Sequence, residues 1–329
     1  MKVSVIVVNH RARELLLECL AHAEAALEGL DGELILIENA SDGETAALVR
    51  EHHPSVTVFE ERENTGFAPA VARGIAAARG EWIALVNNDA NLDAGALRAL
   101  LTAGEADPRI GAVAAQIRFR EQPGVLNSAG LVVDRLGVAF ERLAGAPAAA
   151  GAGAPREVFG ATACVALYRR AMLDAIGGFD ASFFAYLEDV DVAWRARAAG
   201  WRAVYEPAAL ALHRGSASSR EGSPFKYRLV GRNRVRVLAK NATTAQLLRY
   251  GPLMLAFDAA YVLYAGLSDR TLAPLLGRLD GLREWRRYRA AGAATRGPAP
   301  LAPALAGVRG ALGMKRGYRR GGAATVSAP

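Results

Sequence analysis

The sequence has few cysteines: Cys19 and Cys164 are the two in 329 residues. Two cysteines this far apart do not make the disulfide framework that staples small secreted domains. Both lie in apolar segments, where a free cysteine usually packs as a small buried hydrophobe. We therefore expect two core cysteines in a cytosolic chain.

A secretory signal and internal repeats are also missing. Residues 1–8 read as a strand and have neither the long apolar core nor the small-residue cleavage site of a signal peptide. With 52% hydrophobic residues, the chain can bury a large core. We expect a cytoplasmic protein with one large domain and an appendage, or with two domains.

Charge is distributed unevenly along the chain. From Ser216 to the end there are 20 Lys and Arg against 5 Asp and Glu, a net of +15, and the part before it carries 20 basic and 28 acidic residues, a net of −8. A basic surface attracts the phosphates of nucleic acid or of anionic lipid. The basic part lacks the spaced aromatic residues that stack bases, which argues against nucleic acid as a partner.

The first part of the chain has a βαβ rhythm, because short apolar runs alternate with segments of helical periodicity. The predicted strands span residues 3–8, 33–37, 56–59 and 82–86, with helices at 12–27, 44–51 and 70–79 between them. After residue 89 the rhythm breaks, with strands at 110–117, 130–133, 164–168 and 209–212 and helices at 94–102, 170–176 and 188–199. The fold class is therefore α/β, with a mixed, mostly parallel sheet flanked by helices.

Three parts are expected: a body at 1–215, a basic and apolar helical extension at 216–289, and a disordered tail at 290–329 rich in Ala, Gly, Pro and Arg. The run 251–267 is nearly all apolar, with Asp258 as its only charge. It is shorter than the ~20 residues of a spanning helix, and a central Asp opposes insertion. Two alternatives stay open: a helix in the membrane interface, peripheral at the inner face, or a bundle packed on the body.

Polar residues follow the predicted parallel strands. They are Asn9, the run 38–42, and Asn87, Asn88 and Asp89. Ligands of open α/β sheets bind beyond the carboxyl ends of the strands. We expect these side chains to face a ligand.

Asp89 and Asn87 are candidate ligands of Mg²⁺ or Mn²⁺, because hard divalent cations prefer oxygen. One carboxylate and one amide leave room for phosphate and water. His213, at the end of the last predicted strand, could add an imidazole, although a lone histidine is more often structural. A metal and a diphosphate would suit reactions in which a nucleoside diphosphate departs.

The run from Glu188 to Asp191 places three carboxylates in four residues where a loop enters a helix. Alone, such a run is most simply a solvated helix start, favoured by the helix dipole. An acceptor hydroxyl that attacks a sugar must lose its proton, which needs a carboxylate base. Asp189 is the candidate base, and Glu188 and Asp191 are candidates to orient it, tune its pKa or hold the loop.

These motifs, in this order and spacing, resemble family-two inverting glycosyltransferases of the GT-A fold, nearest to the bacterial rhamnosyltransferase-like branch. The resemblance runs from residue 3 to about 213, and its motifs are residues 5–10, 38–42, 64–68 with Gly74, 85–89, 178–180, 188–191 and His213.

The resemblance implies a site for each of these residues. It places the nucleotide-sugar at Asn9, Glu38, Asn39, Asp42, Asn64, Gly66, Phe67 and Asn88; a metal at Asn87, Asp89 and His213; and the catalytic carboxylates at Asp189, Glu188 and Asp191. Glu38 stands where the family usually has Asp, and Asn87 brings no charge to the metal. The implied partners are a dTDP- or UDP-sugar donor and a cell-envelope or lipid-linked glycan acceptor. The implied reaction is inverting transfer of a sugar, with rhamnose as one candidate.

The sequence is less consistent with two other functions. A sugar-phosphate nucleotidyltransferase would need a Gly-rich basic loop after the first strand, and residues 9–13 contain no glycine. A non-catalytic membrane-associated scaffold would not need the acids at both sites.

Overall fold

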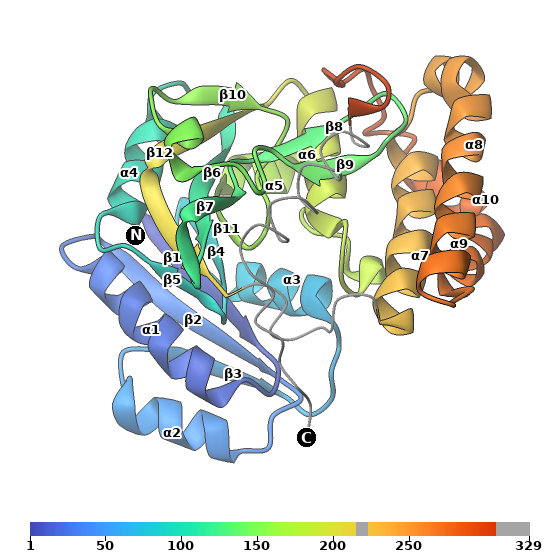
Figure 1. The fold of residues 1–329 in the computed structure, drawn as a ribbon. Coiled ribbons are helices and arrows are strands. Elements are labelled where there is room, and N and C mark those ends of the chain that lie inside the picture. Colours follow the sequence, from blue (N-terminus) through green and yellow to red (C-terminus); the bar gives the residue numbers. More distant parts are fainter. Residues whose placement is uncertain (215–222, 307–329) are drawn as a thin grey trace.

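The computed structural model describes residues 1–214 and 223–306. One ten-stranded sheet forms the centre, with the strand order β10-β12-β6-β11-β4-β1-β2-β3, and β5 and β7 pair with β12 and β6 beside this path. A two-stranded sheet, β8 and β9, lies apart from it. Figure 1 shows the sheet with helices on its faces and a separate group of helices, α7 to α10, on one side.

The first half of the sheet is parallel and alternates with helices. It runs β1 (Val3–Asn9), α1 (Arg13–Leu27), β2 (Gly32–Asn39), α2 (Glu44–His52), β3 (Thr57–Glu61), α3 (Phe67–Ala77) and β4 (Trp82–Asn87). β1 lies between β2 and β4, and Asn9 pairs with Glu38 and Val8 with Asn87. β1, β2 and β4 are buried on both faces, so they read as largely continuous apolar runs, whereas β3 at the edge of the sheet is partly exposed.

The second half is mixed. It runs β5 (Ala90–Leu92), α4 (Ala96–Glu105), β6 (Ile110–Phe119), β7 (Gln122–Ser128), β8 (Leu131–Val133), β9 (Ala139–Glu141), β10 (Arg156–Val158), β11 (Val165–Arg169), α5 (Arg170–Ile176), α6 (Glu188–Ala198) and β12 (Arg202–His213). β11 is antiparallel to β4 and β6, whereas β12 is parallel to β6. The α/β class and the mixed sheet predicted from the sequence are confirmed.

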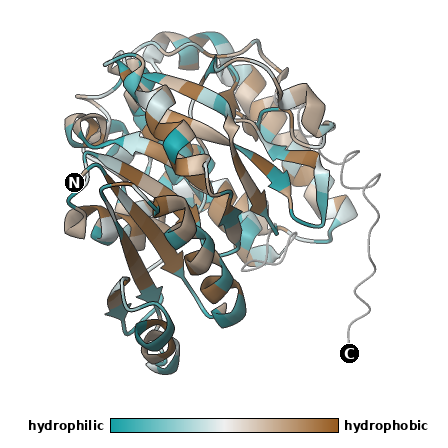
Figure 2. Cartoon of the chain, turned by 90° about the vertical axis from the view of Figure 1, so that its left-hand side faces the viewer, coloured by the Kyte–Doolittle hydropathy of each residue, from teal (hydrophilic) through white to brown (hydrophobic). Residues whose placement is uncertain are grey.

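Successive residues of β1 face opposite layers of the core. Val5 and Val7 pack with α1 and α4, whereas Ile6 packs with α3, α5 and α6. Figure 2 shows the hydrophobic colouring of the strands between helices of mixed polarity. Cys19 and Cys164 are both buried and free, as the sequence predicts.

The extension is helical: α7 (Pro224–Asn241), α8 (Thr244–Ser268), α9 (Ala273–Arg283) and α10 (Trp285–Ala291). α7 packs on α6 and on α9. The tail expected from residue 290 differs in part, because Ala302 pairs its backbone with Val133 and Leu301 packs on the same core cluster as α7. Residues 307–329 of that tail lie outside the described residues.

Candidate active site

Buried amides and one carboxylate connect the carboxyl ends of β1, β2 and β4. Asn9 donates its side-chain amide to both carboxylate oxygens of Glu38, at 3.1 and 2.8 Å, and accepts from Asn88 at 2.5 Å. Burial raises the pKa of Glu38, although the Asn9 amide opposes this. Asn9 and Glu38 thus form a floor that fixes Asn88.

The loop before α3 is held by a second asparagine. Asn39 donates to Asn64 and to the Gly66 carbonyl, both at 3.1 Å, and accepts from the Thr65 N–H at 2.9 Å. Gly66 has φ +96°, and a Cβ there would come within 2.6 Å of Phe184. Only glycine fits this turn against that ring.

A cavity of about 350 Å³ opens at this edge of the sheet. It is lined by Val8, His10, Asn39, Asn64, Gly66, Phe67, Asn87, Asn88, Phe184, Ala185, Tyr186, Ser223 and Phe225. Small-molecule sites typically occupy about 300–1,000 Å³ and combine apolar walls with a few fixed polar groups. Six residues predicted from the sequence therefore line one cavity, and Asn9 and Glu38 support it from below.

Asp89 and His213 meet beside this cavity. His213 Nε2 lies 3.2 Å from Asp89 Oδ1, and its Nδ1 lies 3.0 Å from the side-chain oxygen of Asn127. Burial opposes a charge on His213, but Cys164 and Asp89 beside it raise its pKa well above the usual value. Asp89 is buried and His213 is nearly buried, at the point where β12 pairs with β5.

The Asp89 and His213 pair fits a divalent cation. When Nδ1–H of His213 donates to Asn127, Nε2 faces the Asp89 carboxylate. Nε2 then either carries a proton or binds a cation together with Asp89. A hydrogen bond from the other ring nitrogen, like the one to Asn127, is usual for a histidine that binds a metal. Within residues 1–214 and 223–306, no three His, Cys, Asp or Glu side chains are grouped to hold a metal. Asp89, His213 and Asn87 would therefore supply part of a coordination shell and leave the rest to a ligand and water.

Asp189 begins α6 as a partly buried carboxylate. Its Oδ2 accepts from the Ala163 N–H at 3.2 Å and its Oδ1 from the Val190 N–H at 2.8 Å. Burial raises the pKa of Asp189, and the hydrogen bonds from Ala163, Val190 and Thr162 oppose that shift. A carboxylate withdrawn from water is a stronger base, as a proton-abstracting group requires.

Glu141 is a site residue that the sequence did not indicate. This β9 carboxylate accepts from the Ser128 hydroxyl at 2.5 Å, and the Thr162 hydroxyl lies beside both Glu141 and Asp189 and lowers the pKa of each. Burial raises the pKa of Glu141 to about 7, and the carboxylate of Asp189 adds to the shift while His213 opposes it. Glu141 therefore lies within electrostatic reach of both the candidate base and the candidate metal ligand, and no motif in residues 130–145 pointed to it.

Glu188 lies next to Asp189 and is buried. Its Oε2 has no hydrogen-bond partner among the described residues. Burial raises the pKa of Glu188 to about 8, with a further contribution from Asp189. The two neighbouring carboxylates oppose each other's ionisation, and the deeper burial of Glu188 favours a proton on Glu188 over one on Asp189.

Asp191 and Asp42 do not join the site. Asp191 is fully buried and accepts from Arg195 at 2.6 Å, Lys240 at 3.0 Å and Asn241 at 2.9 Å, so it fastens α6 to α7. Asp42 is exposed and caps α2 by accepting from the Thr45 N–H at 3.1 Å. Asp191 thus holds the structure around the loop, which is one of the roles predicted for it, and it adds to the raised pKa of Glu188. Asp42 lies outside the residues that line the cavity, away from the nucleotide-binding position expected for it.

The extension also contributes to the cavity, which the sequence did not indicate. Phe225 of α7 packs edge-on against Phe184, with ring centroids 6.2 Å apart. Asn233 of α7 donates to the carbonyls of residues 183, 185 and 186, the segment that leads into Glu188. The helical extension is therefore part of the site.

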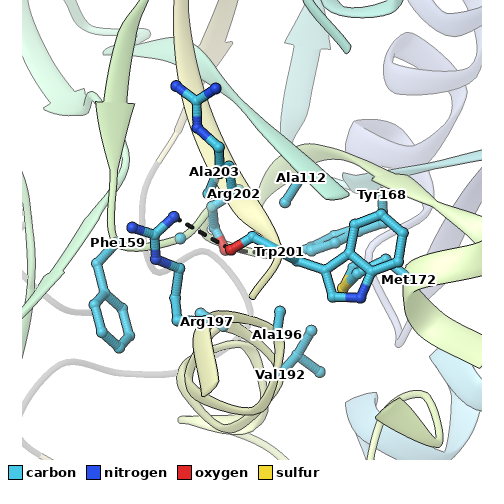
Figure 3. A pocket seen from close by; sticks show the side chains of 13 residues that line it. Ala112, Phe159, Tyr168, Met172, Val192, Ala196, Arg197, Trp201, Arg202 and Ala203 are labelled. Atoms are coloured by element: carbon cyan, nitrogen blue, oxygen red, sulfur yellow. Dashed lines mark hydrogen bonds between the residues drawn. The ribbon is translucent and has the colours of Figure 1, made fainter. Parts of the chain in front are cut away.

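A second hollow, of about 10 Å³, lies between α6 and the sheet (Figure 3). Its walls are mostly apolar, and Arg197 donates to the Trp201 carbonyl at 3.3 Å beside it. It has room for about one water molecule and for no sugar.

Fold and site together define a GT-A enzyme: a sheet whose carboxyl edge carries an amide-lined cavity, an Asp and His pair, and a carboxylate with a raised pKa. Residues 4–177 match the model of glycosyl transferase family 2. The chain belongs to this family and is a glycosyltransferase.

Relatives of known activity match the body of the chain. An N-acetylglucosaminyl-diphospho-decaprenol L-rhamnosyltransferase of Mycobacterium tuberculosis is 30% identical over 209 residues, which cover 56% of this chain and 67% of that protein. The O-antigen biosynthesis protein RfbC of Myxococcus xanthus is 30% identical over 195 residues, 57% of this chain and 15% of that protein. A poly-beta-1,6-N-acetyl-D-glucosamine synthase of Staphylococcus aureus is 26% identical over 183 residues, 54% of this chain and 42% of that protein.

Solved structures share the fold. GalNAc-T7 with UDP, GalNAc and Mn²⁺ has a TM-score of 0.60 at 14% identity and covers 91% of this chain and 58% of its own. The mannosyltransferase PcManGT of Pyrobaculum calidifontis, with GDP-Man and Mn²⁺, has a TM-score of 0.53 at 22% identity and covers 97% of this chain and 82% of its own.

Proposed function

We propose that this glycosyltransferase moves a sugar from a dTDP- or UDP-sugar to a hydroxyl of a lipid-linked or cell-envelope glycan, with inversion at the sugar carbon. L-rhamnose is the first sugar to test, because the Mycobacterium tuberculosis relative is named a rhamnosyltransferase that acts on a lipid-linked acceptor. The observation that carries the proposal is the environment of Asp189, a partly buried carboxylate whose pKa is raised. Glu141 lies within electrostatic reach of both Asp189 and His213, so the candidate base lies on the same side of the protein as the candidate metal ligand.

Each residue has a role in this reaction. Asn39, Asn64 and Gly66 shape the pocket for the nucleotide-sugar, and Asn9 with Glu38 fixes Asn88 at its edge. Asp89, His213 and Asn87 would hold Mg²⁺ or Mn²⁺, which when bound offsets the charge of the diphosphate. The neighbouring structures that contain Mn²⁺ support this assignment.

Asp189 takes the proton of the acceptor hydroxyl. The oxygen then forms a bond to the anomeric carbon from the face opposite the diphosphate, and the bond between that carbon and the diphosphate oxygen breaks. A single base with no second carboxylate nucleophile inverts the configuration in one displacement. Glu188, whose pKa burial raises to about 8, is the member of the pair that holds a proton in this proposal, so that Asp189 can take the proton of the acceptor.

The test is a screen of the purified full chain against UDP-, dTDP- and GDP-sugars, with and without Mg²⁺ or Mn²⁺, followed by NMR of the product's anomeric configuration. We expect one donor class to bind and an inverted product to form. Asp89→Ala should reduce metal-dependent turnover at least tenfold, and Asp42→Ala, which removes an exposed carboxylate outside the cavity, should not. A retained anomeric configuration, or no binding of any donor, would contradict the proposal.

A further inference from the structure

The extension carries an unusual concentration of exposed apolar side chains. In the described part of the chain, 11 of the 14 exposed large hydrophobic side chains lie on α8, on α9 or between them. They are Leu248, Leu253, Leu255, Leu263, Tyr264, Leu267, Leu272, Leu275, Leu276, Leu279 and Leu282. We call this set the leucine face.

The leucine face follows the helical repeat. On α8 exposed residues recur at steps of three or four, as at positions 248, 252, 255, 259, 263 and 267, and on α9 at positions 275, 279 and 282. α8 has 25 residues, and the 18-residue window that makes it long and apolar enough to cross a membrane is only 11% buried. Figure 1 shows α8 at the outer edge of the helical group, away from the sheet.

The opposite side of α8 is tied to the protein by a buried ion pair. Asp258, near the middle of the helix, accepts from Arg234 of α7 at 2.7 Å and from Arg278 of α9 at 2.7 Å. Both guanidinium groups are nearly buried, with side chains 7% and 10% exposed. A spanning α8 would have to pull Asp258 out of these bonds into hydrocarbon, which opposes insertion across a bilayer and favours a helix that lies along its surface.

Exposed charge around the leucine face is mostly positive. Arg249, Arg270, Arg286 and Arg287 are exposed. The acids there already have partners: Asp280 pairs with Arg228 and Arg283, and Asp269 accepts from Tyr227. A second copy docked through the same face would bring like charges together, whereas anionic lipid headgroups complement them.

We propose that the leucine face is a monotopic membrane-docking surface, with α8 and α9 lying in the interface of an anionic bilayer and the neighbouring arginines contacting its headgroups. This deepens the proposed function, since a lipid-linked acceptor would present its hydroxyl at the same surface. α7 connects the two places, because it holds Asp258 through Arg234 and the segment before Glu188 through Asn233. Docking and acceptor binding therefore share one rigid helix.

The test is flotation of the full chain with vesicles of phosphatidylcholine alone or with 30% phosphatidylglycerol. We expect binding to the anionic vesicles and at least tenfold weaker binding to the neutral ones. Leu255→Glu with Leu263→Glu changes two side chains that are 72% and 62% exposed and should reduce binding at least tenfold. Ala21→Glu with Ala47→Glu adds the same charge on exposed positions of α1 and α2 and should leave binding unchanged.

Thermal unfolding and donor binding establish that both double variants are folded. Equal flotation of the two would overturn the proposal, as would a wild-type chain that stays free of vesicles and sediments as a dimer that the leucine variant dissociates. Vesicle binding without any sugar transfer would leave the docking surface intact and refute only the proposed reaction.

Discussion

Asn233 offers a sharp test of how the extension serves the site. It is fully buried, and its side-chain nitrogen lies 3.0, 2.8 and 2.7 Å from the carbonyl oxygens of Phe183, Ala185 and Tyr186. Replacement by alanine removes the donor and leaves the backbone of α7 unchanged. The expected effect can be worked out carbonyl by carbonyl.

The segment that Asn233 holds is strained. Phe184, Tyr186 and Leu187 have φ of 68°, 72° and 64°, in the left-handed region that costs a non-glycine residue about 1–2 kcal/mol. Such a conformation persists only where its surroundings enforce it. Because Glu188 and Asp189 follow directly, relaxation of the segment would move the candidate base.

In Asn233→Ala the carbonyl groups of Ala185 and Tyr186 lose their hydrogen-bond donor, whereas the Phe183 carbonyl keeps a hydrogen bond from Arg232 at 2.8 Å. A buried carbonyl left without its donor costs about 1–3 kcal/mol. We therefore expect Asn233→Ala to lower the free energy of unfolding by about 2–4 kcal/mol. Below its unfolding transition, it should also lower kcat at least tenfold.

Urea denaturation and steady-state kinetics on the same preparations measure both effects. Gln246→Ala is the control, because Gln246 donates to the Arg135 carbonyl from an exposed position and its loss should cost less than about 0.5 kcal/mol. If Asn233→Ala lost less than about 1 kcal/mol and kept its kcat, the extension would not position the base segment.

Three further predictions concern single residues of the site. Folding raises the pKa of Glu188 from 4.5 to about 8, so the contribution of Glu188 to stability is present at low pH and is lost as the pH rises between these two values. Urea unfolding from pH 5 to 9 should show this fall in the wild type and a flatter profile in Glu188→Gln. Gly66→Ala places a Cβ within 2.6 Å of Phe184 at φ +96° and should weaken donor binding at least tenfold in calorimetry, with Gly124→Ala, where a Cβ meets nothing within 4 Å, as the control. Glu38→Asp withdraws the carboxylate from Asn9 and should raise the donor Kd or change the preferred base, and identical donor profiles would contradict the role of this floor.

The parallel half of the fold was predictable from the sequence because its signals are local. β1, β2 and β4 carry apolar runs, helices separate the four strands, and the observed bounds of β1 to β4 differ from the predicted ones by a few residues at most. β7, β9 and β10 were missed, because they are polar or only three residues long and depend on pairing with distant partners. Short strands of this kind have little periodicity to read.

The residues that end strands could be placed at the cavity from the sequence, whereas the separate roles of the acids at the start of α6 depend on the direction of each side chain. Asp189 and Asp191 are two residues apart, and residues two apart on a helix point about 200° from each other. Asp189 therefore reaches the Thr162 side of the site while Asp191 faces Lys240. Glu141 and Asn233 reach the site from separate elements, and no local motif marks them.

The central claim is that Asp189 is the base of the sugar transfer, and Asp189→Asn tests it most directly. With the donor identified, the rate at saturating donor and acceptor is compared with the donor Kd for the wild type and the variant, with Asp42→Asn as the control. We expect kcat to fall by about 10²–10⁴-fold, the usual contribution of a general base, while the donor Kd changes less than about twofold. A variant that binds donor normally and keeps most of its kcat would contradict the claim.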